Sequence, residues 1–202
     1  MLALTPQISR DWIVQRLAAQ PVVERATDFL HFVHPDDFRP TPAAVLVPLI
    51  NRHGGMTVML TQRTAHLNDH AGQISFPGGR VDEGDADRVD TALREAEEET
   101  GLPRGNVQIL GKLPDFDIAT GFRVTPIVGW IEPPVAFAPD PFEVAEVFEV
   151  PLAHFLDPAN HRRHSDEKNG RRRHYYSMPY QDRYIWGATA GMLHALYRFL
   201  GV

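Results

Sequence analysis

The stretch REAEEETGL, at residues 94 to 102, decides how the centre of this chain is interpreted. It closes a segment, residues 86 to 99, in which apolar side chains recur on one side at helical spacing. Gly101 follows the segment, and glycine is the residue best suited to a left-handed helix end. The segment is therefore predicted to form a helix that stops at this glycine.

Three carboxylates fall on one face of the predicted helix. Glu95, Glu98 and Glu99 occupy positions i, i+3 and i+4, which places their Cβ atoms about 5 to 6 Å apart. Like charges at this spacing repel one another, and a divalent cation would relieve the repulsion. Oxygen ligands favour Mg²⁺, Mn²⁺ or Ca²⁺ over zinc. The alternative is a solvated acidic face on which Arg94 pairs with Glu98.

Composition limits the class of protein. The chain has 202 residues, 43% hydrophobic and 23% charged, as expected of one globular domain. The absence of cysteine excludes disulfides, thiolate metal sites and cysteine nucleophiles. A formal net charge of −6 argues against general nucleic-acid binding. The apolar run at residues 43 to 50 is too short to span a membrane and the start lacks a secretory signal, so a cytoplasmic location is expected.

Apolar patterns on both sides of the acidic helix predict a layered α/β sandwich. Two antiparallel strands are expected at residues 43 to 51 and 56 to 63. The Pro-Gly-Gly sequence at residues 77 to 79 is expected to break regular structure, and the polar loop at residues 114 to 121 to line a site. Further elements are predicted as helices at residues 6–20 and 187–200 and as strands at residues 73–76, 107–113, 123–131 and 143–150.

The Gly-Gly pair, an acidic residue after it and the Arg-Glu-Ala-Glu-Glu-Glu-Thr-Gly sequence of the helix together resemble the Nudix box. Five residues separate Gly79 from Asp85, as in the usual box, and eight separate Asp85 from Arg94. Aspartate in place of glutamate and one extra residue are the two departures from the usual pattern. The helical half of the box is intact.

This resemblance implies a Nudix-type α/β/α sandwich with a mixed central sheet, and an enzyme that uses Mg²⁺ or Mn²⁺ to hydrolyse a phosphoanhydride. It implies that Glu95, Glu98 and Glu99 bind the metal, assisted by a backbone carbonyl near Gly78, and that Arg94 orients the carboxylates. These four side chains are the expected catalytic residues. The general base is left open among three later glutamates, Glu143, Glu146 and Glu149.

The segment before the box, residues 59 to 79, resembles the additional motif of coenzyme A pyrophosphatases. The matching positions are Leu60, Thr61, Arg63, Gly72 and the Phe-Pro-Gly-Gly sequence at 76 to 79, whereas Thr64 and Asn68 depart from it. Residues 184 to 190 resemble the ending of the same subfamily. The resemblance implies coenzyme A or acyl-CoA as substrate, 3′,5′-ADP and (acyl-)4′-phosphopantetheine as products, and substrate contacts from Arg63, Gly78 and Gly79.

Two other functions stay open. One is a Nudix hydrolase that acts on ADP-ribose, NADH or a dinucleoside polyphosphate. The other is a non-catalytic Nudix domain that senses a nucleotide. The chain is interpreted as one domain, residues 1–202, with an amino-terminal helical extension at 1–35 and carboxyl-terminal additions at 151–202. A small-molecule substrate is expected, with no nucleic-acid or membrane partner and no prediction of oligomeric state.

Three further features have an open or structural interpretation. The basic cluster at residues 162 to 173 is either a phosphate contact or an exposed hairpin tip. His66 and His70 lack the spacing of a zinc site, which leaves loop packing or substrate contact. The tyrosines and the tryptophan at residues 175 to 186 could stack on adenine, but aromatic residues in a strand-rich ending are usually in the core, and no role is assigned to them.

Overall fold

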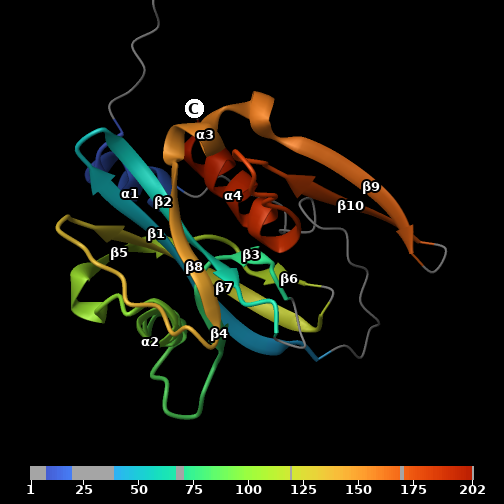
Figure 1. The fold of residues 1–202 in the computed structure, drawn as a ribbon. Coiled ribbons are helices and arrows are strands. Elements are labelled where there is room, and N and C mark those ends of the chain that lie inside the picture. Colours follow the sequence, from blue (N-terminus) through green and yellow to red (C-terminus); the bar gives the residue numbers. More distant parts are fainter. Residues whose placement is uncertain (1–7, 20–38, 67–70, 119, 169–170, 202) are drawn as a thin grey trace, which may run out of the picture.

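The computed structural model describes residues 8–19, 39–66, 71–118, 120–168 and 171–201. A twisted sheet runs through the centre, with α2 (Arg88–Thr100) on one face and α4 (Gly187–Leu200) on the other (Figure 1). The sheet is mixed, because β1 (Thr41–Arg52) pairs antiparallel with β2 (Gly55–Arg63) and parallel with β7 (Phe122–Ile131). This arrangement confirms the predicted α/β sandwich with a mixed central sheet.

The order of strands along the sheet is β3-β2-β1-β7-β5, while β4 pairs with β1, β6 with β7 and β8 with β2. These additional strands are β3 (Ile74–Ser75), β4 (Gly78–Arg80), β5 (Val107–Lys112), β6 (Phe116–Asp117) and β8 (Val144–Pro151). Strands predicted from apolar patterns therefore form with boundaries close to those expected.

Side chains of β1 alternate between two separate cores. Val47 and Leu49 join the core under α4, whereas Leu46 and Ile50 join the core under α2. Successive residues of a strand point to opposite faces of a sheet, so a strand covered on both faces is apolar throughout. This explains why β1 lacks a polar alternation.

Helix α2 has the two ends that its sequence favours. The Asp87 side chain accepts hydrogen bonds from the backbone N–H groups of Val89 and Asp90 and so caps the amino end. Gly101 ends the helix in the left-handed conformation, with φ of 68°. The helix was predicted from residue 86, and it begins at Arg88 because Asp87 acts as its cap.

The opposite face of the sheet carries the remaining helices. In α4, Leu193, Leu196 and Leu200 are fully buried, which confirms the predicted apolar face. Nearby lie α1 (Arg10–Ala18), which Ser9 caps, and α3 (Leu152–Leu156). Short 3₁₀ turns occur at η2 (Arg104–Asn106) and η3 (Pro158–Asn160), and strands β9 (Arg162–Lys168) and β10 (Arg171–Ser177) form an antiparallel hairpin beside α4.

One expectation about loops was wrong, and a second loop contains a short strand. Residues 78 to 80 continue the sheet as β4, paired with residues 43 to 45 of β1, because glycine lets this strand lie close against its neighbour. The loop at 114 to 121 contains β6 and is tied to β7 by Thr125, whose hydroxyl donates to Asp115 at 2.7 Å, and by an Arg123–Asp117 ion pair. Among the described residues, no helix is both long and apolar enough to cross a membrane.

Candidate active site

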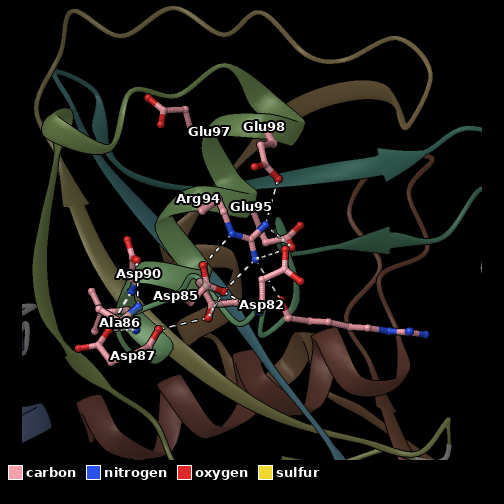
Figure 2. A network of polar contacts seen from close by, with 12 residues as sticks. Asp82, Asp85, Ala86, Asp87, Asp90, Arg94, Glu95, Glu97 and Glu98 are labelled. Atoms are coloured by element: carbon pink, nitrogen blue, oxygen red, sulfur yellow. Dashed lines mark hydrogen bonds and ion pairs between the residues drawn. The ribbon is translucent and has the colours of Figure 1, made fainter.

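Arg94 is the centre of a charged network between α2 and the loop before it (Figure 2). Its guanidinium donates from Nε and Nη2 to the two carboxylate oxygens of Asp85, at 2.8 and 2.9 Å. Its Nη1 donates to Glu95 at 2.8 Å and to Glu98 at 3.1 Å. Figure 2 shows Glu97 pointing away from this group. One arginine therefore holds two carboxylates of the helix and joins them to the preceding loop.

Asp85 fits this network despite its shorter side chain. Its side chain is only 3% exposed, and it also accepts hydrogen bonds from the Thr91 hydroxyl and the Asp82 N–H, at 2.8 and 2.9 Å. Hydrogen bonds from Arg94 are the main reason that the pKa of Asp85 lies well below its usual range. The loop folds back at residues 82 to 85 and brings the aspartate within reach of both guanidinium nitrogens.

Glu99 is the most deeply buried carboxylate of the acidic helix face. Its side chain is 7% exposed, accepts one hydrogen bond from the Gly78 N–H at 3.3 Å and lies 3.7 Å from Arg63 Nη1. Burial raises the pKa of Glu99 to about 8, against the opposing effects of these two contacts. Burial also raises the pKa of Glu95, whereas Glu98 is 60% exposed.

The two glycines of β4 permit this close packing. A Cβ atom at Gly79 would overlap the carboxylate of Glu95, and one at Gly78 would overlap the backbone oxygen of Ala44 and the side chain of Val45. Strand β4 thus passes directly between β1 and the acidic face of α2. Glycine is required at position 78, where a side chain would meet the backbone of β1, whereas a side chain at position 79 would displace the Glu95 carboxylate. The backbone N–H of Gly78 donates to Glu99.

The carboxylates suit a hard divalent cation, although arginines neutralise them here. Within the described ranges, no group of three or more Asp, Glu or His side chains converges into a ready metal site. Glu99 nevertheless holds a desolvated carboxylate, and the negative charge of Glu95 adds to the effect of burial in raising the pKa of Glu99. Buried carboxylates of this kind fit Mg²⁺ or Mn²⁺, which prefer oxygen ligands.

The structure separates the three candidate general bases. Glu149 is bound by Arg52 and Thr57, and Glu146 is bound by Arg183 at 2.6 Å. Glu143 instead lies near the acidic helix face, since its charge adds to the effect of burial in raising the pKa of both Glu95 and Glu99. Of the three, Glu143 is therefore the one whose charge acts on the buried carboxylates of α2.

The turn at residues 140 to 143, which sequence reasoning missed, carries Glu143 to this place. The Asp140 N–H donates to the backbone oxygen of Glu99 at 3.1 Å, and the Thr64 N–H donates to that of Glu143 at 3.0 Å. The turn is thus attached both to the end of α2 and to the residue after Arg63. No motif marks it, because backbone hydrogen bonds between distant segments leave little trace in a sequence.

Other candidate residues lie elsewhere. The basic cluster belongs to the β9–β10 hairpin beside α4, on the other face of the sheet from α2, which favours the hairpin interpretation (Figure 1). Tyr184 and Trp186 are 49% and 41% exposed, so the expectation of a core position was wrong for them. His66 contacts Phe142, whereas Asn68 and His70 lie outside the described residues.

Comparison with known proteins places this arrangement in a family. The NUDIX domain model matches residues 40–168. The uncharacterized Nudix hydrolase NudL of Pectobacterium atrosepticum is 46% identical over 154 residues, 76% of this chain and 80% of that protein. NudL of Escherichia coli K12 is 42% identical over 161 residues, 79% and 83% of the two chains.

A similarity of fold extends to a solved structure. The crystal structure of DR0079 from Deinococcus radiodurans aligns with a TM-score of 0.50 at 14% identity, over 83% of this chain and 91% of that one. The match to the domain model covers more than half of the chain and includes the whole of the network around Arg94. The chain therefore belongs to the Nudix family and is a Nudix hydrolase, an enzyme that cleaves diphosphate bonds.

Proposed function

We propose that this enzyme uses Mg²⁺ or Mn²⁺ to hydrolyse the phosphoanhydride bond of coenzyme A or acyl-CoA, giving 3′,5′-ADP and (acyl-)4′-phosphopantetheine. One observation carries the proposal. Arg63, from the segment that resembles the coenzyme A motif, lies 3.7 Å from Glu99 of the Nudix box. The two sequence patterns therefore meet at one place, where a diphosphate would have to bind for the box to act on it.

Glu95, Glu98 and Glu99 would hold the divalent ion in this proposal. When bound, such an ion neutralises charge on the phosphoryl oxygens and favours ionisation of a nearby water molecule. Arg94 positions Glu95 and Glu98 through its short hydrogen bonds, and Asp85 fixes Arg94 in turn. Contacts with arginines thus hold these carboxylates in place before an ion binds.

Arg63 supplies the positive charge that the substrate needs. Its separation from Glu99 exceeds hydrogen-bond distance, so the guanidinium can turn toward a phosphate without losing a strong contact. The backbone at Gly78 and Gly79 borders the same carboxylates and can approach a ligand closely, since neither residue has a side chain. Glu143 would accept the proton of the attacking water.

The decisive experiment is product analysis with a panel of diphosphates. Purified enzyme is incubated with coenzyme A, ADP-ribose, NADH and a dinucleoside polyphosphate, each with Mg²⁺, with Mn²⁺ and with neither ion. Coenzyme A should be cleaved with the highest kcat/KM, only with a divalent ion, and the products should be 3′,5′-ADP and 4′-phosphopantetheine. Preferred cleavage of another member of the panel would reject coenzyme A, and binding without cleavage of any would indicate a sensor.

A further inference from the structure

Phe142 is an exposed aromatic residue held rigidly beside the candidate active site. Its side chain is 65% exposed, more than any other large hydrophobic side chain in the described ranges. It lies in the same turn as Glu143, directly after the residues that hydrogen-bond to the end of α2. An exposed ring next to a candidate site offers apolar surface that a ligand could bury.

The turn that presents this ring is fixed by hydrogen bonds on both sides. The Phe142 N–H donates to the carboxylate of Asp140 at 2.9 Å, and the hydroxyl of Thr64 donates to the Phe142 carbonyl at 2.8 Å. Thr64 is itself 8% exposed, and its N–H binds the next carbonyl of the turn. These hydrogen bonds hold the backbone that carries the ring. The turn would therefore lose little conformational entropy when a ligand binds to it.

His66 contacts the ring without covering it. The two ring centroids are 4.9 Å apart with the planes inclined at 60°, and both side chains remain exposed. The pair thus forms a small aromatic corner on the surface. A flat ring placed against it would make one stacked contact and one tilted contact, both favourable arrangements for aromatic systems.

The position of the corner relative to Arg63 identifies what it can bind. Arg63 is followed at once by Thr64, which bonds to the Phe142 turn, so the guanidinium and the ring are supported by adjacent residues. A nucleoside diphosphate carries a flat base and a dianionic bridge separated by a single sugar. We infer that Phe142 and His66 form a stacking site for the base of a nucleoside diphosphate whose phosphates contact Arg63.

This inference deepens the proposed function, since it rests on a nucleoside diphosphate being bound at the same site, but it does not require coenzyme A. The Tyr184–Trp186 pair provides a matched comparison. Its rings are 6.4 Å apart and inclined at 29°, and both are exposed, but they precede α4 on the other face of the sheet. Exposure alone therefore does not distinguish the two pairs, whereas the hydrogen bonds from Thr64, the residue after Arg63, to the Phe142 turn do.

The test measures binding of ADP and of inorganic pyrophosphate to the full chain by isothermal titration calorimetry with Mg²⁺ present. Wild type should bind ADP more tightly than pyrophosphate. Phe142→Ala should weaken ADP binding by about 10-fold or more and leave pyrophosphate binding within about 2-fold, because only ADP carries a base. Phe142→Tyr should retain ADP binding, and the control variant Tyr184→Ala should bind both ligands like wild type.

Two results would overturn the inference. The first is wild-type affinity of Phe142→Ala for ADP. The second is equal weakening of both ligands, which would mean that the turn itself was disturbed. Kinetics with coenzyme A separate this failure from failure of the proposed function. If wild type cleaves coenzyme A and Phe142→Ala has the same KM for coenzyme A as wild type, only the inferred stacking site is wrong. If coenzyme A is not cleaved but Phe142→Ala selectively loses ADP, the stacking site stands and only the coenzyme A assignment fails.

Discussion

The two faces of the central sheet differ in what they bury. On the α2 face, Asp85 and Glu95 pair with Arg94 and Glu99 lies near Arg63, and all three carboxylates are largely out of water. Under α4, leucine, phenylalanine and valine side chains from helices and strands pack into the larger of the two cores. Burying a charge costs free energy unless it is paired, while burying apolar surface stabilises the fold. Burial of apolar side chains on the α4 face thus offsets the free energy that is needed to bury charged side chains on the α2 face.

This division of roles predicts that substitutions on the two faces affect different measurements. Changes to carboxylates on the α2 face should reduce turnover and leave stability intact. Changes to apolar side chains on the α4 face should reduce stability and leave the turnover of folded molecules intact.

The largest effect is expected from Glu99→Gln. Loss of this buried carboxylate should lower kcat by at least about 10²-fold, the size typical of lost electrostatic stabilisation, and Glu98→Gln should do the same. The free energy of unfolding of Glu99→Gln should not fall, because burying a neutral amide requires neither desolvation of a charge nor uptake of a proton on folding. Steady-state kinetics and urea unfolding of both variants provide the measurement. Turnover like that of wild type in both would refute the assignment of these carboxylates.

Leu196→Ala should have a smaller effect, and this effect should be on the free energy of unfolding instead of kcat. Leu196 is fully buried in the core under α4, and removing its side chain leaves a cavity. We expect the free energy of unfolding to fall by about 2 to 3 kcal/mol, with kcat within about 2-fold at a temperature where the variant is folded. Val14→Ala, at a position 38% exposed in α1, is the control and should change stability by less than about 0.5 kcal/mol. A large loss of kcat in folded Leu196→Ala would show that the two faces are not independent.

The smallest effect concerns a histidine pair on the α4 face. His161 Nδ1 and His194 Nδ1 are 2.9 Å apart, and His161 Nε2 lies 2.8 Å from the backbone oxygen of Phe155. If His161 Nε2–H donates to that oxygen, its Nδ1 accepts a hydrogen bond from the Nδ1–H of His194. Tyr176 stacks on His194, and burial, with the nearby His161 and Arg198, lowers the pKa of His194 to about 4.

This lowered pKa makes stability depend on pH. The pKa of His194 is about 6.5 in the unfolded chain and about 4 in the folded chain. The unfolded chain therefore binds the proton first as the pH falls, so the free energy of unfolding decreases between pH 6.5 and pH 4 and is unaffected by this group above that range. After allowance for solvent screening, the loss should be about 1 to 2 kcal/mol. Urea unfolding at pH 7.5 and 4.5 should show this loss for wild type relative to His194→Gln. Glu95 and Glu99 titrate in both proteins, so their effects cancel, and identical pH dependence would reject the prediction.

Periodicity and local chemistry made much of the fold predictable. The apolar spacing of residues 86 to 99 and the glycine after them indicated α2 with its left-handed end, and the apolar run at residues 43 to 50 indicated β1. The Leu193, Leu196 and Leu200 series indicated which face of α4 is buried. These features depend on neighbours within a few residues, which is the range over which a helix or strand imposes its own periodicity.

The missed features depend on partners far away along the chain. Pro-Gly-Gly was expected to form a turn, but β1, more than 30 residues earlier, pairs with Gly78–Arg80 and makes it a strand. Asp85 departs from the usual box, and only the folded loop shows that it reaches Arg94 with both oxygens. The turn carrying Phe142 and Glu143 has no motif at all.

The sequence alone determined that three carboxylates would share one helix face, because the 3.6-residue repeat of an α-helix follows from backbone geometry. Only the tertiary structure decided how these carboxylates differ. Glu99 is buried against Gly78 and Arg63, Glu95 lies against Gly79, and Glu98 stays in solvent. Burial is set by which distant strands pack over the helix, and the free energy of a charge depends on that surrounding more than on the residue itself.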